Sequence, residues 1–177
     1  MTGSRTVFLR LALLLALATS LVSIAAAQSF RFPTSGRFIL PPSLGKKLLD
    51  QCSRPVPTMI IEFWQPSEKE IDVLEVSLAK YLEQREKDGK SIPPKGLYHR
   101  QYVGFVSQVG SVHNSERFIY GNFYPDAKEI LSDWRDGRPR DEAKGPMDIC
   151  DGGPAFWGIV YQVSTKTFEA PEFNGGF

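Results

Sequence analysis

The sequence has few of the residues that most enzyme chemistry uses. It contains 2 cysteines and 2 histidines in 177 residues. Two histidines without a nearby cluster of acids or cysteines make a poor zinc site, and the H-E-x-x-H pattern is missing. A G-x-S-x-G nucleophile turn, a phosphate loop and a dinucleotide fingerprint are missing as well. The enzyme classes that these motifs define are therefore excluded, and we assign no catalytic residue, metal or cofactor.

An excess of charge of one sign is also missing. The chain carries 21 basic and 20 acidic residues, and the two kinds are mixed along it. Binding to a nucleic-acid backbone needs a dense row of Lys and Arg that displaces counterions. The sequence therefore predicts no nucleic-acid partner, and the charged runs are interpreted as solvated faces.

Long apolar runs are confined to the first 27 residues. This segment begins with Arg5 and Arg10, continues through an apolar stretch, and reaches Ala25 and Ala27 just before Gln28. That order is typical of a cleaved secretory signal, and the apolar part is shorter than the roughly 20 residues of a membrane span. We expect an exported protein, periplasmic or secreted, that begins near Gln28 and has no stable membrane insertion after cleavage. The remaining length suits a single domain.

Both cysteines, Cys52 and Cys150, lie beyond the signal. An even number of cysteines in an oxidising compartment most often pairs, so we predict a disulfide between them. The alternative is a reactive thiol. Asp151 beside Cys150 argues against it, because a neighbouring negative charge raises the pKa of a thiol.

The mature chain is predicted to be α+β. Residues 28–57 are interpreted as an N-terminal arm with a short helix from Ser43 to Cys52, and residues 58–177 as a single α+β domain. Residues 58–64 are rich in β-branched and aromatic residues and predict a strand. A helix of about 20 residues follows, because Ser67 and Glu70 have the spacing of a capping box and Gly89 can end it. Its apolar positions form one stripe: Ile71, Leu74, Leu78 and Leu82.

The second half of the chain predicts mainly strands. They cover residues 97–109, 115–124 and 155–163, with a shorter one in 165–173, and a short helix is expected at 126–134. In 155–163, Trp157, Ile159 and Tyr161 share the core face. We expect one long amphipathic helix packed on a curved antiparallel sheet of four to five strands.

Two resemblances accompany this prediction. The order of elements is similar to cystatin-like and helix-grip folds, which implies that arrangement but carries no function. The segment from Cys150 to Gly158, CDGG-x2-FWG, with the closing FNGG, resembles that of small exported bacterial proteins of unassigned function. QYVGF at 101–105 and QVGSV at 108–112 lack the cystatin spacing Q-x-V-x-G, so we interpret them as an ordinary strand and turn.

The CDGG segment is itself interpreted as structural. An acid followed by two glycines is typical of a turn, here one that follows a disulfide and leads into the strand at 155–163. Gly158 is expected to let backbone or an aromatic ring pack closely across the sheet.

The candidate ligand-binding residues are Tyr120, Asn122 and Tyr124, which alternate with Ile119 and Phe123. An exposed row of Tyr and Asn suits a sugar or peptide surface. The preferred hypothesis is a non-enzymatic module that binds a protein or a glycan of the cell envelope.

The alternative is a small hydrolase whose site combines His99 with nearby carboxylates such as Glu62 and Asp151. His113, in the turn after the strand of His99, is the second histidine. Convergence of His99 with an acid in a pocket would favour this alternative.

Overall fold

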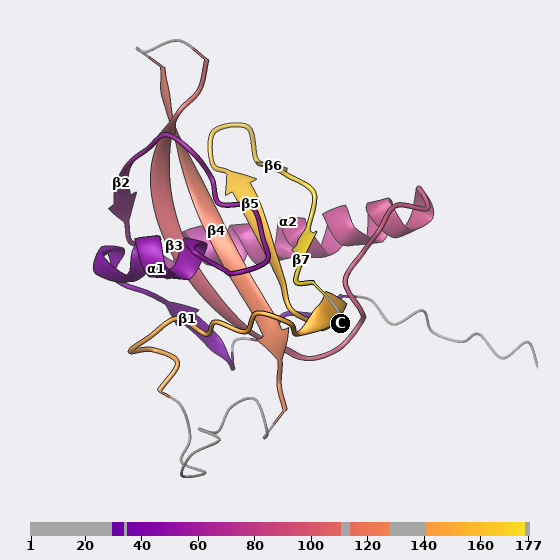
Figure 1. The fold of residues 1–177 in the computed structure, drawn as a ribbon. Helices are drawn as coiled ribbons and strands as arrows, with labels where there is room; N and C mark the ends of the chain where they lie inside the picture. The colour runs from indigo at the N-terminus through magenta and orange to yellow at the C-terminus, as the bar shows by residue number, and fades with distance from the viewer. Residues whose placement is uncertain (1–29, 34, 111–113, 128–140, 176–177) are drawn as a thin grey trace, which may run out of the picture.

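The computed structural model describes residues 30–33, 35–110, 114–127 and 141–175 and has an α+β fold with a mixed sheet (Figure 1). The elements follow one another as β1 (Arg37–Ile39), η1 (Pro42–Leu44), α1 (Gly45–Leu49), β2 (Ile60–Trp64), α2 (Glu68–Lys87), β3 (Tyr98–Gln108), β4 (Ser115–Pro125), η2 (Gly153–Ala155), β5 (Trp157–Gln162), β6 (Thr167–Phe168) and β7 (Glu172–Phe173). Seven strands form one sheet in the order β1-β3-β4-β5-β6, with β2 also pairing β3 and β7 also pairing β5.

Helix α2 begins and ends where its sequence predicts. The Ser67 Oγ accepts the backbone N–H of Glu70 at 3.3 Å, and the Glu70 carboxylate accepts the N–H of Ser67 at 2.8 Å. This capping box satisfies two of the N–H groups that every helix leaves unpaired at its start. The helix ends just before Gly89, whose φ is 66°. The predicted stripe is buried, each of its four side chains being 0% exposed.

Three antiparallel strands, β3, β4 and β5, form the middle of the sheet. Helix α2 packs across one face of these strands (Figure 1). The core there joins the α2 stripe to side chains that include Trp157, Ile159 and Tyr161. The predicted core face of the last long strand is therefore confirmed.

Residues before position 58 contribute to the sheet and to its packing. Strand β1 pairs in parallel with β3, and α1 buries Leu48 and Leu49 against the face opposite α2. The sheet is consequently mixed rather than purely antiparallel, and it has seven strands rather than four to five. Strand β1 has three residues, which are too few to show the alternating pattern of a strand, and its parallel partner is distant in the sequence. The sequence therefore did not predict it.

A buried ion cluster links α2 to the sheet. Glu75 on α2 accepts hydrogen bonds at 2.9 Å from the Nε of Arg100 and from the hydroxyl of Tyr102, both on β3. Arg37 on β1 lies 3.3 Å from the other Glu75 oxygen. Arg100 is 0% exposed, and Glu75 supplies the charge that balances it.

The predicted disulfide is confirmed. Cys52 and Cys150 are bonded, with their Cα atoms 5.1 Å apart, and the bond ties the chain after α1 to the loop before β5. The CDGG segment forms a turn in which Gly153 has a φ of 64°, and η2 then leads into β5. The backbone N–H of Gly153 donates to the carbonyl of Gly175, so the CDGG and FNGG segments lie against each other.

Other predictions fall outside the described residues. They are the signal segment and Gln28, most of the predicted helix at 126–134, the end of the QVGSV stretch, and His113. The QYVGF stretch lies inside β3, as an ordinary strand. Among the helices that the structure describes, none has both the length and the hydrophobicity of a membrane span.

Candidate functional site

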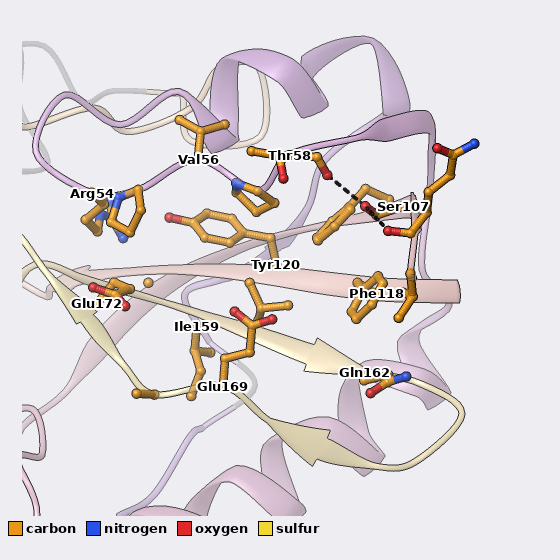
Figure 2. Close-up of a pocket in the computed structure, with 18 of the residues that line it drawn as sticks. Arg54, Val56, Thr58, Ser107, Phe118, Tyr120, Ile159, Gln162, Glu169 and Glu172 are labelled. Carbon is orange, nitrogen blue, oxygen red and sulfur yellow. Dashed lines mark hydrogen bonds between the residues drawn. The ribbon is translucent and has the colours of Figure 1, made fainter. Parts of the chain in front are cut away.

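A cavity of about 580 Å³ lies on the sheet face opposite α2. Strands β3, β4 and β5 provide its floor, and residues 54–58 and 169–172 border it (Figure 2). Its volume lies within the range of cavities that hold small ligands.

The sequence explains why residues 54–58 border the cavity. Pro55 and Pro57 lack the N–H that a sheet ladder needs, so the chain crosses the sheet face without joining it. The Ser107 hydroxyl on β3 donates to the carbonyl of Thr58 at 2.8 Å, which fixes the far end of this segment. The disulfide at Cys52 fixes its near end.

The floor is aromatic. Phe105 on β3 and Phe118 on β4 stack with their ring centroids 5.2 Å apart and their planes 17° from parallel. Tyr120 lies next to them, and its hydroxyl points toward Arg54 (Figure 2). No described residue hydrogen bonds to this hydroxyl. Burial raises the pKa of Tyr120 to about 12, so at neutral pH the hydroxyl carries its proton and can donate it.

Gly158 makes room for this arrangement. It follows Trp157 on β5, and a Cβ placed on it would lie 2.4 Å from the Tyr120 hydroxyl oxygen and 2.5 Å from the Nη1 of Arg54. Tyr120 pairs with Val160, so its ring reaches diagonally over the residue two positions away on β5. The expected close packing at Gly158 is therefore confirmed, and the ring involved is that of Tyr120.

Two carboxylates lie at the edge formed by the C-terminal strands. Glu169 follows β6 and Glu172 begins β7, and both line the cavity together with Gln162. Burial and the charge of Glu172 raise the pKa of Glu169. Glu172 is paired with Gly158, over which the Tyr120 hydroxyl lies, so carboxylate acceptors and this hydroxyl donor are close together in the cavity.

The predicted binding residues share one strand face, but they do not form an exposed row. Tyr120, Asn122 and Tyr124 are 5%, 2% and 1% exposed, because the 50–58 segment and the 141–156 loop cover this face. Tyr120 lines the cavity. Asn122 accepts a hydrogen bond from Arg54 and donates one to the carbonyl of Met147.

Tyr124 belongs to a second cluster with His99. Its hydroxyl donates to Glu142 at 2.6 Å, and burial with this hydrogen bond raises the pKa of Tyr124. The Nδ1 of His99 lies 2.7 Å from the same Glu142 oxygen, and its Nε2 lies 3.3 Å from Asp126. His99 thus meets two acids, but they are not the predicted Glu62 and Asp151. Glu62 pairs with Val106 at the β2 side of the sheet, and Asp151 is in the CDGG turn.

Cys52, Cys150 and Asp148 also lie close together. Both sulfur atoms are in the disulfide, so they are not available as thiolate metal ligands. The group is a cross-link beside an exposed acid.

Several residues of the cavity were not predicted. Arg54 lies in a proline-containing stretch that the sequence indicates only as an interruption between a helix and a strand. Glu169 and Glu172 lie in the region of the short final strand. The prolines on either side of Val56 were the signal that this segment would cover a sheet rather than join it. Nothing in the local sequence around Glu169 and Glu172 indicates a binding site, because their neighbours in the cavity come from strands that are distant in the sequence.

Comparison with known proteins identified no relative of this chain. No family model matches the chain, and neither the curated proteins nor the solved structures contain a significant match.

Proposed function

We propose that this protein is a non-enzymatic binding module and that its ligand is a glycan held in the cavity. The observation that carries the proposal is a concave site of about 580 Å³ with an aromatic floor and polar groups around its edge. Sugar rings present apolar C–H faces to aromatic rings and hydroxyls to carboxylates and amides. Phe118, Glu169 and Gln162 provide these three kinds of group within one site.

A glycan fits this site better than a protein surface does. Protein interfaces of standard size need about 800 Å² on each partner, whereas a recess of this volume encloses a small polar molecule. The Tyr120 hydroxyl and the acids at 169 and 172 point to a ligand with both acceptors and donors.

The experiment is isothermal titration calorimetry on the protein produced from its full sequence in a bacterial host. Oligosaccharides derived from bacterial envelope polymers, neutral and acidic, are the ligands. Phe118→Ala removes part of the floor and is expected to weaken binding by about tenfold or more. Phe168→Ala is the matched control, because Phe168 is also half-buried and stacks on Tyr81, but away from the cavity.

Equal weakening by both variants would contradict binding in the cavity. Failure of every oligosaccharide to bind the wild-type protein would contradict the proposed function. Thermal unfolding of each variant shows whether the fold is retained.

We also propose that the protein is exported. The signal-like segment before Gln28 and the disulfide support this compartment, since disulfides persist where the surroundings are oxidising. Intact-mass measurement on protein recovered from the periplasm or the medium tests it. The expected mature chain begins within a residue or two of Gln28, and a mass that retains residues 1–27 would contradict cleavage.

A hydrolase built on His99 is the second candidate, and the 2.7 Å contact between His99 and Glu142 favours it. Both ring nitrogens already face carboxylates, so His99 would have to leave Asp126 before it accepted a proton from a substrate. Cleavage products in the mass spectrum of an incubated oligosaccharide, lost in His99→Gln, would support this candidate over the binding module.

A further inference from the structure

Glu169 is a carboxylate of the cavity that has no positive partner. Its backbone is fixed on both sides, because its N–H donates to the carbonyl of Val160 at 3.0 Å and its carbonyl accepts from the hydroxyl of Tyr81 at 2.9 Å. Its side chain lines the cavity, and the carboxylate points toward the side where Tyr120 lies (Figure 2). Burial and the charge of Glu172 raise its pKa, and no basic group of the described residues opposes them.

The charges around the cavity leave Glu169 without compensation. The charged side chains that line it within the described residues are Arg54, Glu169 and Glu172, one positive and two negative, which gives a net charge of −1. Glu172 pairs with Gly158, over which the Nη1 of Arg54 lies, and Asp148 also acts electrostatically on Arg54. These two acids therefore oppose the charge of Arg54. A cation that enters the cavity is attracted to Glu169.

Tyr120 provides an observation that is independent of the acids. The residue is 5% exposed and lines the cavity, and its hydroxyl lies over Gly158 without a hydrogen-bond partner among the described residues (Figure 2). A buried hydroxyl without a partner is costly, so this position calls for a ligand atom that accepts from it. Its place beside Glu172 sets this donor next to a carboxylate acceptor.

A ligand that satisfies both groups carries an accepting oxygen and a positively charged donor on neighbouring atoms. A 2-amino-2-deoxyhexose has this arrangement, because its amine and a hydroxyl are on adjacent carbons. Aromatic rings such as those of Phe105 and Phe118 attract both the C–H face of a sugar and a nearby cation. An acidic sugar would instead meet two carboxylates.

We infer that the ligand is a glycan with unacetylated hexosamine, whose protonated amine lies at Glu169 and Glu172 and whose neighbouring hydroxyl oxygen accepts from Tyr120. This inference rests on the proposed function, because it names the ligand class of the same cavity. The charge-assisted hydrogen bonds of the amine to the carboxylates give selectivity over a neutral sugar.

The test compares two trisaccharides that differ only in the amine: β-1,4-linked glucosamine trimer and cellotriose, which has a hydroxyl in place of each amine. Calorimetry at about pH 6, where a primary amine is protonated, is expected to show that the glucosamine trimer binds about fivefold more tightly or better. Both acids are exposed, so raising NaCl from about 50 mM to about 500 mM should reduce the preference.

Glu169→Gln keeps the size of the side chain and removes its charge, so it is expected to reduce the preference severalfold while cellotriose binds as before. The double variant Glu169→Gln with Glu172→Gln is expected to abolish the preference. Glu83→Gln is the matched control, because it removes the same charge from α2, on the other face of the sheet. It should leave the preference unchanged.

Equal wild-type affinity for the two sugars, or tighter binding of cellotriose, would overturn the inference and leave the glycan-binding proposal intact. A preference that persists in the double variant, or that falls as much in Glu83→Gln as in Glu169→Gln, would also overturn it. Failure of both sugars to bind would overturn the inference, and the wider set of oligosaccharides then decides the proposed function separately.

Discussion

Glu75 shows how one residue joins the two layers of the fold. It is 7% exposed at its side chain and accepts from the Arg100 guanidinium and the Tyr102 hydroxyl. Removing one partner of a buried pair leaves the other charge without compensation, and this costs more than the pair contributes.

We therefore predict that Glu75→Gln lowers the free energy of unfolding by about 3–5 kcal/mol. Glu68→Gln is the control, because Glu68 also bonds to Arg37, at 2.9 Å, but is 71% exposed. Its loss is expected to cost less than about 1 kcal/mol. Urea unfolding measures both, and similar costs for the two variants would contradict a special role for the buried carboxylate.

The tyrosines make the protein sensitive to alkaline pH. Burial raises the pKa of Tyr98 and of Tyr120 to about 12, and it raises the pKa of Tyr102, Tyr124 and Tyr161 as well. The folded state then holds protons that the unfolded state releases near pH 10. The protonated tyrosines therefore make their full contribution to the free energy of unfolding below about pH 10. This contribution is lost as the pH rises toward 12, because the unfolded state is then favoured by the release of protons.

We predict that the free energy of unfolding falls steeply between about pH 10 and pH 12, by about 1.4 kcal/mol per pH unit for each tyrosine that stays protonated. Urea unfolding across this range measures the slope. Tyr120→Phe should make it shallower, and an unchanged slope in that variant would contradict the raised pKa of Tyr120.

At the scale of elements, helix α2 combines a local start signal with a buried stripe. The Ser67 side chain satisfies a backbone N–H at the first turn. Ser77, in the middle of the same helix, donates instead to the carbonyl of Val73 at 2.8 Å, a carbonyl that the helix already uses.

The same substitution should therefore have opposite effects at the two positions. We predict that Ser67→Ala lowers the free energy of unfolding by about 1 kcal/mol, because it removes the cap. Ser77→Ala should leave stability unchanged or raise it by a few tenths of a kcal/mol, since Ala has the higher helix propensity. Thermal unfolding of the pair tests this, and a cost at Ser77 equal to that at Ser67 would contradict it.

At the scale of the whole molecule, the disulfide closes a long loop. Cys52 and Cys150 are separated by 98 positions in the sequence, and the segment between them includes β2, α2, β3 and β4. In the chain-entropy model, closing a loop of this length stabilises the fold by about 4–5 kcal/mol through the unfolded state.

We predict that the double variant Cys52→Ser with Cys150→Ser loses a few kcal/mol of this stability, measured by urea unfolding. Reductant should destabilise the wild-type protein by a similar amount and leave the double variant unchanged. Wild-type stability that does not respond to full reduction would contradict a stabilising cross-link.

The sequence alone determined the features that depend on near neighbours. The capping box at Ser67 and the stripe of α2 follow from spacings of three and four residues. The long strands follow from β-branched and aromatic content, and the turn at Gly153 from its acid and glycines. The disulfide followed from an even cysteine count together with the signal-like N-terminus.

The tertiary structure decided what depends on segments that meet from far apart. Strand β1 is part of the sheet because its three residues pair in parallel with Arg100 to Tyr102 on β3, 63 positions later in the sequence. The face of Tyr120 became the floor of a cavity because the 54–58 segment covers it. Tyr120 and Glu172 meet beside Gly158 only when β4, β5 and β7 pair, and Arg54 reaches the same place from the 54–58 segment. No local pattern encodes that meeting, since pairing depends on the whole sheet.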